Sequence, residues 1–136
     1  MNRLRGEISA IESCGSVALV DVRVGERRYA ATLLGAGGKA ASWRPGQAIS
    51  LLFNETEVAL AKNLTGLISL RNRLPGTVTA VERGQVLSRV CFDVDGIEVA
   101  AVITSRSLDM LALAIGDRVE GLVKANEMHV VEDVAP

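Results

Sequence analysis

The segment Ser69-Leu-Arg-Asn-Arg-Leu-Pro-Gly76 lies at mid-chain and opens the second copy of an internal repeat. When the chain is aligned with itself at an offset of 70 residues, Asn2 falls on Asn72 and Gly6 on Gly76, with no gap down to the C-terminus. Identities at both ends of so long a window indicate two copies of one small domain. Further identities pair Arg3 with Arg73, Leu4 with Leu74, Ala10 with Ala80, Glu12 with Glu82, Val20 with Val90, Val24 with Val94, Ala30 with Ala100, Ala31 with Ala101, Gly46 with Gly116, Leu52 with Leu122 and Glu57 with Glu127.

The repeat divides the 136-residue chain into two units near the lower size limit for independent folding. We predict a first barrel at residues 1–62, a linker at 63–70 and a second barrel at 71–136, with Ser69 and Leu70 of the linker serving the second barrel. The linker is too short and too poor in Gly and Ser to act as a flexible tether. The two units should therefore pack in a fixed relation.

The strand pattern is the same in both copies: three strands, a short helical turn, a glycine and two more strands. In the second copy we expect strands at 77–81, 86–94, 98–104, 119–124 and 127–131, with a helix over 105–113. In the first copy the strands are expected at 4–11, 17–24, 27–34, 48–53 and 57–61. This order predicts an all-β protein made of two tandem OB-like five-stranded barrels, each with one short helix.

Composition limits the classes of function. Hydrophobic residues make up 49% of the chain but aromatic residues only 3%, so the core must be built from Val, Leu, Ile and Ala. The net charge of −1 gives no broad basic face for nucleic acid or anionic lipid, although a local basic pocket is still allowed. Binding of single-stranded nucleic acid through stacked aromatic rings is disfavoured for the same reasons.

The chain begins Met-Asn-Arg-Leu-Arg-Gly without an apolar signal region, and it has no apolar run of membrane-spanning length. We therefore expect a cytoplasmic protein. Cys14 and Cys91 fall at non-equivalent positions of the repeat, so they are expected to be reduced structural thiols.

Three polar clusters in the second copy could converge on one ligand. Thr104 and Ser107 stand three residues apart where a strand passes into a helix, so hydroxyls and free N–H groups can face the same point. Lys124 adds a positive charge and Arg71 a planar donor fork, and neither side chain is an acceptor. Such a donor set suits a tetrahedral oxyanion. The three clusters are Ser69 with Arg71, Thr104 with Ser107, and Lys124 with Ala125.

Taken singly, each of these patterns is usual on a protein surface or at a helix cap. Together they resemble the molbindin (Mop) family, whose domain is also called TOBE. The segments that carry the resemblance are 69–78, 102–107 and 123–125, which are similar to the family's Ser-Ala-Arg-Asn-x-Leu-x-Gly, Val-Val-Thr-x-x-Ser and Ile-Lys-Ala motifs. The family includes small molybdate-binding proteins, tandem di-Mop proteins, and effector domains of the molybdate-responsive repressor and of molybdate-transporter ATPases.

The resemblance implies that molybdate or tungstate is bound through hydrogen bonds and charge, without direct metal ligation by the protein, at an interface between Mop domains. The binding groups need not all come from one chain. Leu70 replaces the usual Ala, which keeps the backbone donor and adds bulk beside the ligand. Carried over by position, the oxyanion-binding residues are Ser69, Leu70, Arg71, Thr104, Ser107, Lys124 and Ala125.

The first copy departs from these motifs. Leu34 stands where Thr104 does, Gly37 where Ser107 does, and Asn54 and Glu55 where Lys124 and Ala125 do. Asn and Glu would make the equivalent position neutral or repulsive for a dianion. We predict that the first copy does not bind an oxyanion there.

The sequence therefore predicts a cytoplasmic oxyanion-binding protein for storage, buffering or sensing of molybdate or tungstate. No nucleophile with a base, carboxylate pair or cofactor loop stands out, so neither an enzyme nor a cofactor is expected. A site at a domain interface implies a homo-oligomer, with a trimer favoured over a dimer. The alternative is a regulatory or interaction module of a molybdate-responsive regulator or transporter, which would contact a protein partner without storing the anion.

Overall fold

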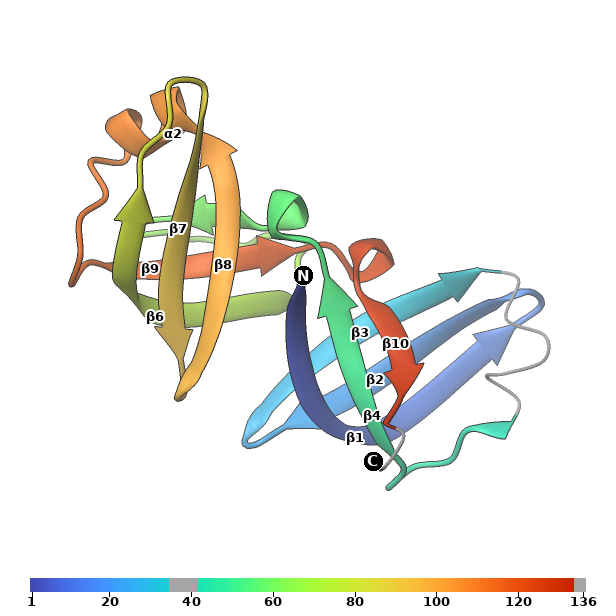
Figure 1. The fold of residues 1–136 in the computed structure, drawn as a ribbon. Coiled ribbons are helices and arrows are strands. Elements are labelled where there is room, and N and C mark those ends of the chain that lie inside the picture. The colour runs from blue at the N-terminus through green and yellow to red at the C-terminus, as the bar shows by residue number, and fades with distance from the viewer. Residues whose placement is uncertain (35–41, 134–136) are drawn as a thin grey trace.

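The computed structural model describes residues 1–34 and 42–133. Two curled, antiparallel five-stranded sheets are joined side by side (Figure 1). Their strand orders are β10-β4-β1-β2-β3, called barrel 1 here, and β5-β9-β6-β7-β8, called barrel 2. The strands are β1 (Asn2–Cys14), β2 (Val17–Val24), β3 (Arg27–Leu34), β4 (Ala48–Phe53), β5 (Ala59–Ala61), β6 (Asn72–Glu82), β7 (Leu87–Val94), β8 (Ile97–Thr104), β9 (Arg118–Val123) and β10 (His129–Glu132).

The predicted all-β class with two OB-like five-stranded units is confirmed. The division of the chain at residue 62 differs from the structure in one respect, because the last strand of each copy lies in the sheet of the other. Strand β10 pairs with β4, and His129 lies opposite Leu52. Strand β5 pairs with β9, and Ala59 lies opposite Leu122. The two barrels are therefore linked by exchanged strands as well as by the segment 63–70, which explains a fixed relation between them.

Short 3-10 turns carry the chain from one barrel to the other. Turn η1 (Glu55–Glu57) lies between β4 and β5, and turn η2 (Ala125–Glu127) lies between β9 and β10. The sequence predicted that the last strands begin at residues 57 and 127, but the turns take these residues and the strands begin two residues later. A strand that must reach the other barrel needs a change of direction first.

The helix of the second copy, α2 (Ser105–Met110), is shorter than the predicted 105–113. It ends early because Ala112 has a positive φ of 49° and turns the chain away from the helical path. The short helix expected in the first copy falls largely on residues 35–41, outside the described part of the chain.

Bends in β1 and β6 allow each of these strands to serve two neighbours. Residues 2–7 of β1 pair with β4, and residues from Glu7 onward pair with β2. Gly6 and its repeat partner Gly76 lie at these bends, where a Cβ atom would overlap the backbone oxygen of Arg23 or Asp93. Glycine is thus needed for the close approach of two strands.

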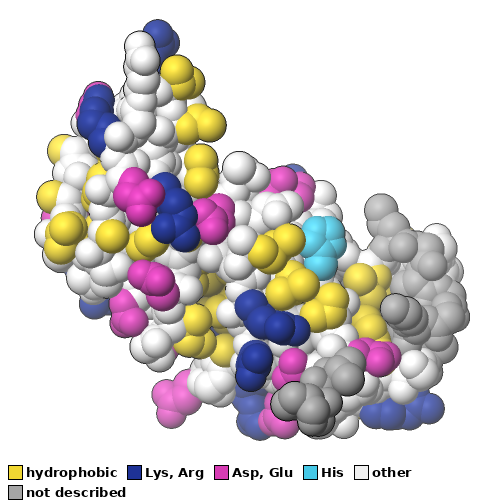
Figure 2. All heavy atoms as spheres, viewed as in Figure 1, with side chains coloured by type: hydrophobic (Ala, Val, Ile, Leu, Met, Phe, Trp, Pro, Cys, Tyr) yellow, Lys and Arg dark blue, Asp and Glu magenta, His cyan; other side chains and the backbone are white. Residues whose placement is uncertain are grey.

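The core is mainly aliphatic, as the composition predicted, but it also contains the four aromatic residues, of which Phe53 and Phe92 are fully buried. The tryptophan, Trp43, is buried, and its ring nitrogen donates to a carboxylate oxygen of Glu132 in β10 at 3.0 Å. On the face drawn in Figure 2, acidic and basic side chains are interspersed among hydrophobic ones. The Lys and Arg side chains drawn there form no continuous basic area.

Candidate anion-binding site

A pocket of about 260 Å³ lies where the two barrels meet. Its wall brings together residues that are about 50 positions apart in the sequence, because η2 packs beside the segment that precedes β6. Five of the seven predicted residues line it: Ser69, Leu70, Arg71, Lys124 and Ala125. The remaining lining residues are Leu19, Ala30, Thr32 and Asn126.

Turn η2 places Lys124 at the crossover between the barrels. Lys124 precedes the turn in an extended conformation, with φ −68° and ψ 148°. The turn is closed by the N–H of Glu127, which donates to the Lys124 carbonyl at 2.9 Å, and by the N–H of Met128, which donates to the Ala125 carbonyl at 3.3 Å. The Lys124 side chain is exposed at the pocket, so its ammonium group can approach a solute.

A buried amide fixes the other side of the pocket. Asn72 donates to the carbonyl of Ala30 at 2.8 Å and accepts from the N–H of Ala30 at 2.7 Å, so it ties the start of β6 to β3 of barrel 1. Arg71 directly precedes Asn72, so the hydrogen bonds of Asn72 fix the position of Arg71 relative to β3. Its side chain is 66% exposed, which leaves the guanidinium group accessible to a ligand.

One carboxylate lies near the cationic groups without lining the pocket. Asp21 of β2 has an oxygen 3.9 Å from Arg71, and the same oxygen is buried and has no hydrogen-bond partner among the described residues. At that distance the two side chains attract each other without a hydrogen bond. The donors of Arg71 therefore stay available at the pocket.

Thr104 and Ser107 do not reach this pocket within one chain. They lie at the junction of β8 and α2, where the Thr104 hydroxyl accepts from the N–H of Ser107 at 3.1 Å and lies 2.8 Å from the Ser107 hydroxyl. Thr104 is thus the N-cap of α2, and one N–H group that the sequence offered to an anion is already used. Ser107 lines a separate hollow, with Ala59 and Leu60 of β5. Within one chain the pocket therefore joins two of the three clusters, and the participation of Thr104 and Ser107 stays a prediction.

The sequence missed the wall that the first copy contributes. Leu19 lies on β2, and Ala30 and Thr32 lie on β3, in the copy whose own motif is degenerate. No local pattern marks these residues, because they meet the pocket only through the packing of one barrel on the other. Asn126 could have been found as the residue after the Lys-Ala pair.

Residues 1–34 and 42–133 contain neither a membrane-spanning helix nor a cluster of metal-ligating side chains. No helix there is long and apolar enough to cross a membrane. No group of three or more His, Cys, Asp and Glu side chains in the same ranges could hold a metal ion.

The chain is similar to several proteins whose names refer to molybdenum or molybdate. Residues 68–130 match the TOBE domain family. The molybdenum import ATP-binding protein ModC of Brucella abortus (strain 2308) is 41% identical over 78 residues, which are 57% of this chain and 22% of that protein. The molybdenum transport protein ModE of Herbaspirillum seropedicae is 32% identical over 132 residues, which are 95% of this chain and 49% of that protein. The chain thus spans about a fifth and about half of the length of these relatives.

The whole fold is also found in a solved structure. The cytoplasmic molybdate-binding protein ModG, crystallised with molybdate bound, superposes with a TM-score of 0.91 at 24% sequence identity, and the match covers 97% of this chain and 96% of ModG. At this level of identity the likeness shows a shared tandem fold. Residues 68–130 of this chain are therefore a domain of the TOBE family, and they lie within a tandem fold like that of ModG.

Proposed function

We propose that this protein binds molybdate or tungstate at the pocket between the barrels, through hydrogen bonds and charge, and that it serves in the cytoplasm for storage, buffering or sensing. The observation that carries this proposal is the meeting of Ser69, Arg71 and Lys124 at one pocket, from segments that are far apart in the sequence. The molybdate-binding ModG has the same fold. The proposed role is binding and release, without chemistry on the anion.

The donor set supports a fully deprotonated oxyanion. Lys124 and Arg71 have donors only, and the Ser69 hydroxyl can donate as well. Molybdate, tungstate and sulfate present acceptors on every oxygen at neutral pH, whereas hydrogen phosphate also carries a proton that needs an acceptor. We therefore expect phosphate to bind more weakly than molybdate. The volume of about 260 Å³ accommodates a tetrahedral anion with bound water.

We further propose that the site is completed in a homo-oligomer, with a trimer favoured over a dimer. In this arrangement a second copy brings Thr104 and Ser107 to the pocket that holds Lys124 of the first. Large apolar side chains are available for such contacts, because Leu67 is fully exposed and Met110 is 80% exposed. Light scattering with and without molybdate measures the number of chains, and a strictly monomeric protein that binds at full affinity would contradict this part of the proposal.

Calorimetric titration with molybdate, tungstate, sulfate and phosphate tests the binding function. We expect saturable binding of molybdate in the native protein and an affinity about 10-fold to 100-fold lower in Lys124→Ala, because one charge-assisted hydrogen bond is lost. Arg5→Ala is the matched control, since Arg5 is an exposed cation of β1 outside the pocket lining. Equal affinities in all three proteins would contradict the assignment of the site.

A second candidate function is favoured by the relatives ModC and ModE, each of which is longer than this chain. In that case the tandem barrels act as a regulatory or interaction module that contacts a protein partner and does not store the anion. Absence of heat with all four oxyanions, in a protein that is folded by circular dichroism, would favour this second function.

A further inference from the structure

The junction at η1 is the structural counterpart of the proposed site at η2. In the repeat, Asn54-Glu55-Thr56 corresponds to Lys124-Ala125-Asn126, and both segments carry the chain from one barrel into the other. Asn54 has φ −70° and ψ 146°, against φ −68° and ψ 148° for Lys124. The backbone of the second junction therefore has the geometry that we assign to anion binding.

The surroundings of the two junctions are equivalent as well. Asn2 donates to the carbonyl of Ala100 at 2.8 Å and accepts from its N–H at 2.9 Å, which reproduces the bonds between Asn72 and Ala30 in the other half. The same edge of a β-strand thus faces each turn, β3 at η2 and β8 at η1. The molecule has two equivalent places where a turn, a strand edge and an amide anchor meet.

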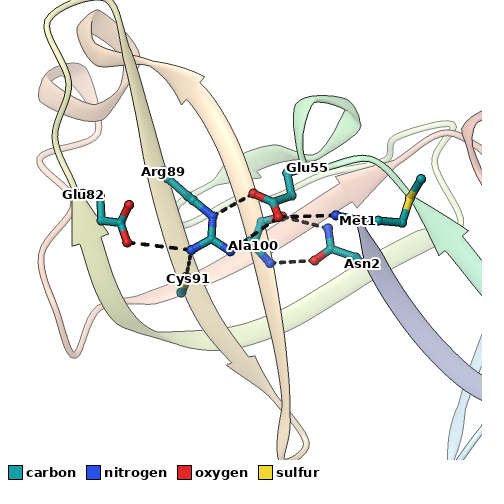
Figure 3. A network of polar contacts seen from close by, with 7 residues as sticks. All are labelled: Met1, Asn2, Glu55, Glu82, Arg89, Cys91 and Ala100. Atoms are coloured by element: carbon teal, nitrogen blue, oxygen red, sulfur yellow. Dashed lines mark hydrogen bonds and ion pairs between the residues drawn. The ribbon is translucent and has the colours of Figure 1, made fainter.

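At the η1 junction Asn54 stands where Lys124 does, so the lysine is absent, and two charged side chains are present that the η2 junction lacks. Glu55 stands in place of Ala125, and Arg89 of β7 stands in place of Leu19, a wall residue of the open pocket. These two side chains bind each other (Figure 3): Arg89 Nε donates to one Glu55 oxygen at 2.7 Å, and Arg89 Nη2 donates to the other at 3.4 Å. The guanidinium fork is therefore occupied by a carboxylate from the chain itself.

The remaining neighbours of Arg89 are weaker partners. Its Nη1 atom lies 3.2 Å from the sulfur of Cys91 and 3.9 Å from a carboxylate oxygen of Glu82, whose side chain is 71% exposed. The nitrogen of Met1 lies 3.5 Å from Glu55 (Figure 3). The hydrogen bond from Arg89 lowers the pKa of the Glu55 carboxyl, so this group is ionised at neutral pH.

We propose that the Glu55 carboxylate occupies, at the η1 junction, the place that a free oxyanion takes at the η2 junction, and that the chain thereby contains a second, latent oxyanion site whose cation is Arg89. This inference rests on the proposed function, because the role of the η2 junction defines the role of its counterpart. Removal of the carboxylate opens the latent site to small dianions such as molybdate and sulfate.

A tethered carboxylate is an effective substitute for a free anion. A guanidinium group binds carboxylates and tetrahedral oxyanions with the same pair of parallel donors. Because Glu55 is attached to the turn, its effective concentration at Arg89 is on the order of millimolar or higher, so a dilute solute competes poorly. The native chain therefore uses one open site, and the second junction serves as a fixed ion pair between β7 and η1.

The test uses a background in which the open site is disabled. Lys124→Ala is combined with Glu55→Ala and Glu82→Gln, so that neither carboxylate is left to pair with Arg89, and the triple variant is titrated with molybdate and with sulfate. We expect saturable binding that is at least about tenfold tighter than in Lys124→Ala alone. Arg89 is 40% exposed at its side chain, so water can solvate it and the fold should survive the loss of its partner.

Matched controls test whether Arg89 is the binding cation and whether the anion occupies the volume vacated by the Glu55 carboxylate. Adding Arg89→Met to the triple variant should abolish the new binding, and replacing Glu55→Ala by Glu55→Gln should weaken it, because glutamine keeps the volume of the displaced group. A folded triple variant that binds no better than Lys124→Ala would overturn the inference. Persistence of the new binding in the Arg89→Met variant would overturn it equally.

The outcome for the open site is read separately. Binding in the native protein that is lost in Lys124→Ala supports the proposed function, whatever the triple variant does. Absence of binding in the native protein together with binding in the triple variant contradicts the proposed function and supports the latent site.

Discussion

Two buried asparagine side chains join the barrels, and each satisfies both backbone groups of one alanine on the edge of the opposite barrel. Asn72 bonds Ala30 of β3, and Asn2 bonds Ala100 of β8. A strand edge that is buried without such partners would lose the hydrogen bonds that it makes to water in the unfolded chain. The amides therefore stabilise the junctions at which we propose the open and the latent anion sites.

Asn72→Ala should lower the free energy of unfolding by about 2–4 kcal/mol, because it leaves a buried N–H and a buried carbonyl of Ala30 unpaired. Asn54→Ala is the control, since Asn54 is exposed and its side chain makes no capping bond, and it should cost less than about 0.5 kcal/mol. Urea unfolding followed by circular dichroism measures both values. Equal values for the two variants would show that the two hydrogen bonds between Asn72 and Ala30 are not important for stability.

Glu55 makes a pH-dependent contribution. Its hydrogen bond with Arg89 holds the pKa of the folded state below the usual value of 4.5. A depressed folded pKa means that the native state binds fewer protons than the unfolded state, so the stabilisation is fully present above pH 4.5 and is lost as the pH falls through the folded value. The difference in unfolding free energy between the native protein and Glu55→Gln should therefore be constant from pH 7 to 6 and shrink towards pH 3. Other carboxylates are common to both proteins and cancel, so an unchanged difference at pH 3 would contradict the role of this ion pair.

At the level of single elements, β1 and β6 each pair with two other strands because they bend at a glycine. Residues before the bend pair with β4 or β9, and residues after it pair with β2 or β7. A bulge follows each bend, between Ile8 and Ala10 and between Val78 and Ala80. A bulge increases the local twist of a strand. The glycine bend and the bulge together curl each sheet into a barrel.

Gly76→Ala should destabilise the protein by about 1–3 kcal/mol, because its Cβ would overlap the backbone oxygen of Asp93 and β6 and β7 would have to separate. Thr79→Ala, at an exposed position of the same strand, is expected to change stability by less than about 0.5 kcal/mol. Thermal unfolding scans of the two variants provide the measurement. A Gly76→Ala protein as stable as Thr79→Ala would rule out the close approach at the bend.

For the whole molecule, the exchange of β5 and β10 determines where the sites form. Each crossover brings a turn of one copy against a strand edge of the other, as η2 does at β3. Lys124 lies beside Thr32 and Ala30 because the exchange of β10 leads the chain from β9 across to barrel 1. The exchange also makes the stability of barrel 1 depend on residues at the far end of the sequence.

Val130→Asp should therefore disturb barrel 1, although the residue belongs to the second copy. Val130 is 9% exposed and pairs with Leu51 of β4. The ring nitrogen of Trp43 in barrel 1 donates a hydrogen bond to Glu132, two residues further along β10. Trp43 is the single tryptophan of the chain, so a red shift of its emission reports the loss of β10. Leu60→Asp in β5 is the control and should leave the emission unchanged while it destabilises barrel 2. A red shift in Leu60→Asp alone would contradict the exchange.

The sequence by itself determined the local features. The repeat gave two equivalent units, and alternating patterns placed β2, β3 and β4 at their observed bounds. Two short motifs, at 69–78 and 123–125, located five of the residues that line the open pocket. These features depend on neighbours along the chain, which alternation and turn residues report directly.

The tertiary structure decided which barrel receives β5 and β10, and it placed Thr104 and Ser107 away from Lys124. Because the two copies have nearly the same strands, either last strand could pair with either β4 or β9, and the pattern within a strand does not distinguish these pairings. The pairing of Glu55 with Arg89, 34 residues apart, depends on the same choice. Long-range pairing is settled by the packing of the whole chain, and for that reason the latent site becomes visible only in three dimensions.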